Sequence, residues 1–145
     1  MNGSDFLLVA IRLAVAGTEA DWRTAVSQAY YATFHVARRL FADLQFLVPR
    51  ADRAHQYLVF RLSNCGEAPV EQAGRDLGTL RRLRNRADYD EVPPLTQAQA
   101  AAAVRLAEDI LRALDGARPD PPRIRIRDAM IVYERDVLHD VTWQP

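Results

Sequence analysis

Residues 22–44 read WRTAVSQAYYATFHVARRLFADL, and their larger apolar side chains recur with the spacing of one helix face. At about 100° per residue, one side of such a helix carries Trp22, Val26, Ala29, Tyr30, Thr33, Ala37, Leu40, Phe41 and Leu44. Thr18 precedes this stretch and is followed by acidic residues, as at a helix N-cap. The pattern predicts a long helix that begins after Thr18, ends near Phe46 and packs this side against a core.

Further helical patterns lie on both sides of this stretch. They cover residues 5–16, 53–62, 69–89 and 96–114, and Gly, Asn, Ser or Pro residues stand between them. Helices joined by short loops favour an antiparallel arrangement. The sequence therefore predicts an all-α fold, an up-and-down antiparallel bundle of four to five helices, within residues 1–116.

The character of the chain changes after residue 116. Residues 117–122 form a Pro-rich linker, and Arg and Ile alternate with period two over Arg123–Arg127. Period-two alternation suits a strand or an extended segment. We expect residues 117–145 to form a linker and a C-terminal extension with a short extended arm, in which residues 128–139 are helix or strand.

The composition restricts the classes of function. The 145 residues carry no net formal charge, so no overall field attracts the chain to nucleic acid or to an anionic membrane. A single cysteine, Cys65, excludes an intramolecular disulfide and a thiolate metal cluster. All 19 basic residues are arginine, whose planar fork suits phosphate. No apolar run is long enough to cross a membrane, so we expect a cytoplasmic protein without membrane contact. We also expect no bound metal and no cofactor.

The second face of the long helix is unusual for plain surface. Tyr31, His35 and Arg38 follow the spacing i, i+4, i+7, so their side chains can touch. An aromatic ring, an imidazole and a guanidinium together fit a dimer interface or one wall of a cleft. An ordinary amphipathic surface is the alternative interpretation.

An arginine interrupts the apolar stripe of the helix predicted over residues 69–89. Arg84 lies on the stripe of Ala73, Leu77, Leu80 and Ala87. Asp88 follows one turn later and can hold the guanidinium, and Asn85 and Tyr89 form a parallel i, i+4 pair, with Arg81 beside both pairs. A charge on an inward stripe is costly unless it is paired or functional. The position of Arg84 therefore predicts either a structural ion pair or an arginine that binds phosphate in a cleft.

Two stretches resemble the HEPN family, whose name stands for higher eukaryotes and prokaryotes nucleotide-binding. Residues 25–40 are similar to the family's second-helix signature, and residues 83–90 are similar to its motif helix. In order and spacing, the resemblance covers about residues 4–114. It implies a helical bundle that forms a homodimer, in which two motif helices meet in one composite cleft.

The resemblance also implies an activity. Many members are metal-independent endoribonucleases, often toxins of toxin–antitoxin or defence systems, whose motif is an Arg, a polar residue and a later His. Arg84 and Asn85 match the first two positions, and Tyr89 takes the place of the His. A tyrosine hydroxyl holds its proton at neutral pH and is a poor general base.

Several functions therefore stay open from the sequence. A ribonuclease would use Arg84 to stabilise the scissile phosphate and Tyr89, Asn85 or His35 to orient the 2′-hydroxyl, with Asp88, Arg81 and Tyr31 as binding or orienting residues. A degenerate site would bind RNA, a nucleotide or a protein without chemistry. The chain could also be the partner of a small nucleotidyltransferase or of an antitoxin, or a purely structural helical dimer.

Overall fold

The computed structural model describes residues 3–145, and within them every regular element is helical. The elements are α1 (Gly3–Ala14), α2 (Glu19–Asp43), α3 (Arg53–Leu62), α4 (Ala68–Tyr89), α5 (Gln97–Gly116), α6 (Pro122–Tyr133) and a π-helical turn, η1 (Glu134–Leu138). The predicted all-α bundle is confirmed. None of the helices in residues 3–145 is long and apolar enough to cross a membrane.

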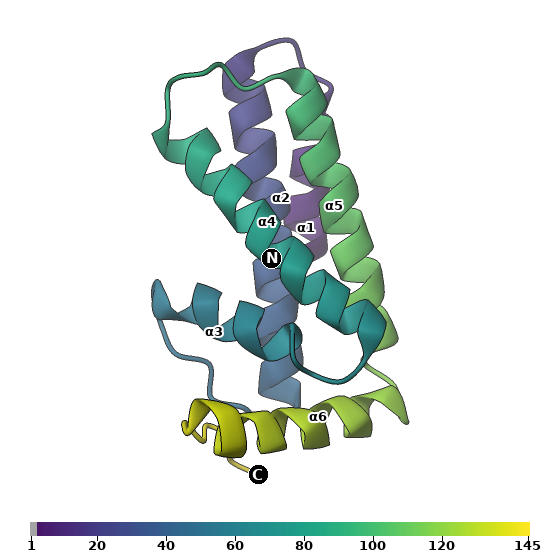
Figure 1. Cartoon of the computed structure of the whole chain (residues 1–145). Coiled ribbons are helices and arrows are strands. Elements are labelled where there is room, and N and C mark those ends of the chain that lie inside the picture. Colours follow the sequence, from purple (N-terminus) through teal and green to yellow (C-terminus); the bar gives the residue numbers. More distant parts are fainter. Residues whose placement is uncertain (1–2) are drawn as a thin grey trace.

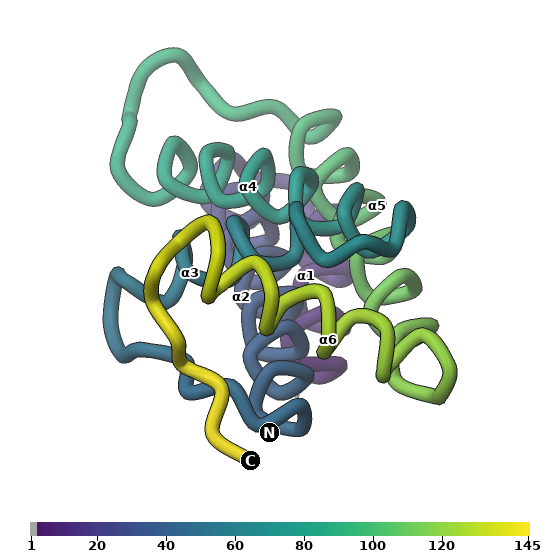
Figure 2. The backbone as a smooth tube through the Cα atoms, turned by 60° about the horizontal axis from the view of Figure 1, so that its bottom comes forward, coloured from purple at the N-terminus to yellow at the C-terminus, as the bar shows by residue number. Residues whose placement is uncertain are grey.

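The helix α2 is the centre of the bundle. It packs against α1, α4 and α5, and α4 crosses it obliquely (Figure 1). The shorter helices α3 and α6 lie across the lower end in this view, and Figure 2 shows α6 running over that end. The upper end carries the loop between α4 and α5 (Figure 1).

Local sequence explains where the long helices begin. The side chain of Thr18 accepts a hydrogen bond from the backbone N–H of Asp21, so Thr18 is the N-cap of α2, as predicted. Thr96 and Gln99 form a reciprocal capping box at the start of α5. These side chains satisfy backbone donors that have no partner within the helix.

The predicted apolar stripe of α2 lies in the core, but the burial extends further around the helix. All of its stripe residues are buried except Trp22, which is partly buried. Ala25, Ala32 and Phe34 are buried as well. Because α2 has neighbours on several sides, the two-faced pattern read from the sequence describes only part of its burial.

The expected extended C-terminal arm is wrong, because Arg123–Arg127 lie in the first turns of α6. Ile126 and Met130, one helical turn apart, are completely buried and join the core, whereas Ile124 is exposed. Arg123 contacts the end of α2, because its Nη2 donates to the Asp43 carbonyl at 2.8 Å. Burial at helical spacing therefore overrides the local period-two alternation.

A buried ion pair attaches the C-terminal residues to α3. The Nε of Arg61 donates to Oε2 of Glu134 at 2.8 Å, and both side chains are almost completely buried. The second carboxylate oxygen of Glu134 accepts the backbone N–H groups of Thr142 and Trp143 at 2.9 and 3.2 Å. Glu134 thus holds both α3 and the last residues of the chain.

We expect the substitution Glu134→Gln to destabilise the protein by about 3–5 kcal/mol, because it leaves the buried Arg61 charge with only the exposed carboxylate of Asp140, 3.6 Å away. The free energy of unfolding from urea titrations followed by circular dichroism measures the loss. The control Asp109→Asn removes the exposed partner of Arg112 and should cost at most about 1 kcal/mol. Equal losses in the two variants would contradict the role given to Glu134.

Candidate functional site

Arg84 lies in the C-terminal part of α4, on the face that meets the core. The stripe residues Ala73, Leu77, Leu80 and Ala87 are all buried, as the sequence predicted. The Arg84 side chain is 12% exposed. Its position on an apolar face requires polar partners nearby.

Three side chains hold the Arg84 guanidinium. Its Nε lies 2.9 Å from Oδ2 of Asp88, which is the predicted ion pair one turn apart. Its Nη1 donates to Oδ1 of Asn85 at 3.0 Å, and its Nη2 donates to the Tyr31 hydroxyl at 2.5 Å. The guanidinium carbon also lies 5.1 Å from the ring centroid of Tyr31, within cation–π range. Tyr31 thus joins α2 to the motif on α4.

A buried histidine from α3 lies behind this cluster. The ring nitrogen Nδ1 of His55 is hydrogen-bonded to the Tyr30 hydroxyl, and the Tyr30 ring centroid lies 5.6 Å from the Arg84 guanidinium carbon. Burial lowers the pKa of His55, and the positive charges of Arg81 and Arg84 lower it further. Burial raises the pKa of Tyr30. His55 is therefore a neutral partner of a protonated phenol.

His55 is not among the site residues predicted from the sequence. Its partner Tyr30 is 25 positions away, and the two meet only because α3 folds back over α2. Helical spacing within one segment carries no signal for such a pair.

Tyr31 contacts both Arg84 and His35, the other predicted site residue on α2. The ring of His35 stacks on Phe6 of α1, with centroids 4.9 Å apart, and lies 6.2 Å from the ring of Tyr31. Burial lowers the pKa of His35, and the charge of Arg38 adds to the effect. His35 lines a separate cavity of about 510 Å³ between α1, α2 and α5.

The solvent-facing part of the motif is an open depression of about 490 Å³. Its lining includes four of the predicted site residues, which are Arg81, Arg84, Asn85 and Tyr89. Tyr89 is 72% exposed, and its ring centroid lies 5.9 Å from the Arg84 guanidinium carbon. Asp52, Arg82, Arg86 and Asp90 complete the lining.

Some buried arginine nitrogens at this site lack a hydrogen-bond acceptor. At this site within residues 3–145, this holds for the Nε atoms of Arg81 and Arg86, whereas the Arg84 Nε has Oδ2 of Asp88 2.9 Å away. A buried donor without an acceptor is unfavourable. The depression itself is lined by four arginines, which offer positive charge to an anionic group.

The lowered pKa of His55 predicts how stability depends on pH. Below the ordinary histidine pKa of about 6.5, His55 is protonated in the unfolded chain but stays neutral in the folded chain. Acid therefore favours unfolding. The free energy of unfolding should fall from about pH 7.5 to about pH 5.5, and His55→Gln should make this fall smaller.

His139→Asn is the matched control, because it removes an exposed histidine and keeps both His35 and His55. If the free energy of unfolding falls equally with pH in the wild type and in His55→Gln, folding does not lower the pKa of His55.

Comparison with known protein families agrees with the motif. Residues 4–117 match the model of a family described as HEPN domain. Comparison with curated proteins and with solved structures gave no match. Because the family model covers well over half of the 145 residues, the chain belongs to the HEPN family.

Proposed function

We propose that this protein binds RNA as a homodimer, and that Arg84 of each copy contacts the phosphate backbone. The observation that carries the proposal is the group of four arginines on α4, Arg81, Arg82, Arg84 and Arg86, that line one open depression. Phosphate oxygens are the acceptors that the planar guanidinium matches best.

The local charge supports a phosphate ligand although the whole chain is neutral. Arg81, Arg82, Arg84 and Arg86 line the depression, opposed by Asp52 and Asp90. Two of the Arg84 nitrogens already donate to Asn85 and Tyr31, which fixes the direction of the guanidinium before any ligand arrives. A preorganised donor loses little side-chain entropy on binding.

Tyr89 supports single-stranded RNA as the form of nucleic acid. Its ring is mostly exposed at the edge of the depression and lies next to the arginines. Unpaired bases stack on exposed aromatic rings, whereas bases within a duplex cannot. Phosphate contact by arginine and stacking on Tyr89 would together hold one nucleotide.

The family membership supports the homodimer, because HEPN domains often dimerise. Val92, in the loop that follows α4, is 80% exposed and leaves an apolar side chain for a partner to cover. A second copy that packs on this loop and leaves the Tyr89 ring free for RNA would bring the two Arg84 side chains into one cleft.

The surroundings of the histidines favour binding over cleavage. His55 is 7% exposed and occupied by Tyr30, and His35 is stacked on Phe6. A general base must reach the proton that it removes. Tyr89 stands at the position of the motif His. A toxin–antitoxin or defence role, with a nucleotidyltransferase or an antitoxin as partner, stays a prediction.

Fluorescence anisotropy with a labelled single-stranded RNA tests the proposal. Arg84→Ala should weaken binding by about tenfold to a hundredfold, because a charge-assisted hydrogen bond contributes about 1.5–3 kcal/mol. Arg112→Ala removes an exposed arginine on α5 that pairs with Asp109 and is the matched control. Equal affinities of the wild type and Arg84→Ala would contradict the proposal.

The same mixtures, kept in a metal chelator and separated on a denaturing gel, distinguish binding from cleavage. We expect intact RNA with the wild type. RNA cut by the wild type but not by Arg84→Ala would replace binding with ribonuclease activity. Tyr31→Phe then tests the Tyr31 hydroxyl, which accepts a hydrogen bond from Arg84 at 2.5 Å.

A further inference from the structure

Arg23 of α2 caps the end of α4. Its Nη1 donates to the carbonyl oxygens of Arg86, Ala87 and Asp90 at 3.2, 2.9 and 2.6 Å. Its Nη2 donates to the carbonyl of Glu91 at 3.3 Å. The last carbonyls of a helix have no partner within the helix, and a positive charge is favourable there. Arg23 therefore satisfies the C-terminal end of the motif helix from outside.

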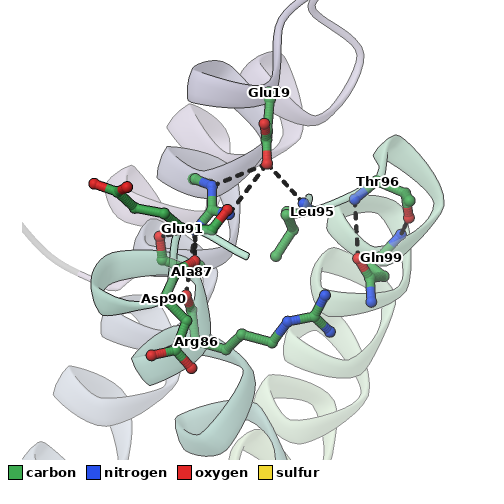
Figure 3. Close-up of polar contacts among 9 residues, drawn as sticks. Glu19, Arg86, Ala87, Asp90, Glu91, Leu95, Thr96 and Gln99 are labelled. Atoms are coloured by element: carbon green, nitrogen blue, oxygen red, sulfur yellow. Dashed lines mark hydrogen bonds and ion pairs between the residues drawn. The ribbon is translucent and has the colours of Figure 1, made fainter. Parts of the chain in front are cut away.

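Glu19 holds Arg23 in this position. Its Oε1 accepts from Nε and Nη2 of Arg23 at 3.2 and 3.1 Å, one turn apart on α2. The same oxygen accepts the backbone N–H of Leu95 at 2.7 Å, just before α5 begins. Figure 3 shows the Glu19 carboxylate joined to the backbone of Leu95. The Leu95 N–H and the Arg23 side chain lower the pKa of Glu19, so the carboxylate stays charged.

This Glu19–Arg23 clamp acts directly next to the motif. Two of the carbonyls that Arg23 binds belong to Arg86 and Ala87, the residues before Asp88. Asp88 in turn contacts the Arg84 guanidinium at 2.9 Å. The clamp thus fixes the turn of α4 that carries Asp88 and Tyr89.

We propose that Arg23, held by Glu19, is a positioning residue of the RNA site. It keeps the last turn of α4 closed, so that Asp88 aims Arg84 and Tyr89 lines the depression. This inference rests on the proposed function, because it assigns Arg23 a role in that same site without contact to RNA.

Amide hydrogen exchange tests the clamp without any RNA. In Arg23→Gln, the amides of residues 86–90 and of Leu95 should exchange at least about tenfold faster, whereas amides in the middle of α1 and α5 keep their rates. Arg23→Lys keeps the positive charge but not the planar guanidinium, so the same amides should exchange at a rate between those of the wild type and Arg23→Gln. Glu19→Gln should loosen the same residues. Arg112→Gln serves as the control on α5.

RNA affinity then tests the positioning role. Arg23→Gln should weaken binding on the order of tenfold, and adding it to Arg84→Ala should cause less than about a twofold further loss, because residues in one network are not additive. If Arg23→Gln weakens RNA binding by the same factor in the Arg84→Ala background as in the wild type, Arg23 acts independently of Arg84. That result would overturn the inference.

The remaining outcomes are also decisive. Unchanged exchange in both Arg23→Gln and Glu19→Gln would show that the clamp does not hold the end of α4. Faster exchange with unchanged RNA affinity would show that the clamp is structural only. If Arg84→Ala itself binds RNA like the wild type, the proposed function fails, whereas the exchange data still report on the clamp.

Discussion

A guanidinium on an apolar helix face needs polar partners that replace water. Arg84 occupies a stripe otherwise made of alanine and leucine, and a charge there is unfavourable unless partners replace water. Asp88 and Asn85 come from the same helix, and Tyr31 comes from α2. These partners fix the direction of the side chain but leave it beside an open depression, which is the arrangement that an anion-binding arginine requires.

The second layer of contacts extends this constraint through the bundle. Arg23 holds the end of α4 from α2, and His55 of α3 meets Tyr30 behind the Arg84 guanidinium. The helix α3 also carries Arg61, whose ion pair with Glu134 attaches the C-terminal residues. The residues after 117, beyond the family match, are therefore connected through α3 to the surroundings of the motif.

Regular spacing within one helix made much of this predictable. The sequence correctly predicts the stripe of α4, the Arg84–Asp88 pair and the cap at Thr18, because each depends on residues three or four positions apart. His55 and the capping role of Arg23 escaped prediction because Tyr30 and the carbonyls at the end of α4 lie on other helices than these two residues. The Arg–Ile alternation misled for a related reason: only the tertiary contacts of Ile126 and Met130 decide that residues 123–127 are helical.

The central claim is that the Arg84 guanidinium contacts RNA phosphate, and nuclear magnetic resonance of the arginine Nε–H groups tests it most directly. In ¹⁵N-labelled protein, with the Arg84 signal assigned from Arg84→Lys, adding single-stranded RNA should shift the Arg84 resonance and leave that of Arg112 in place. An Arg84 resonance that stays unchanged while the RNA is bound would contradict the account.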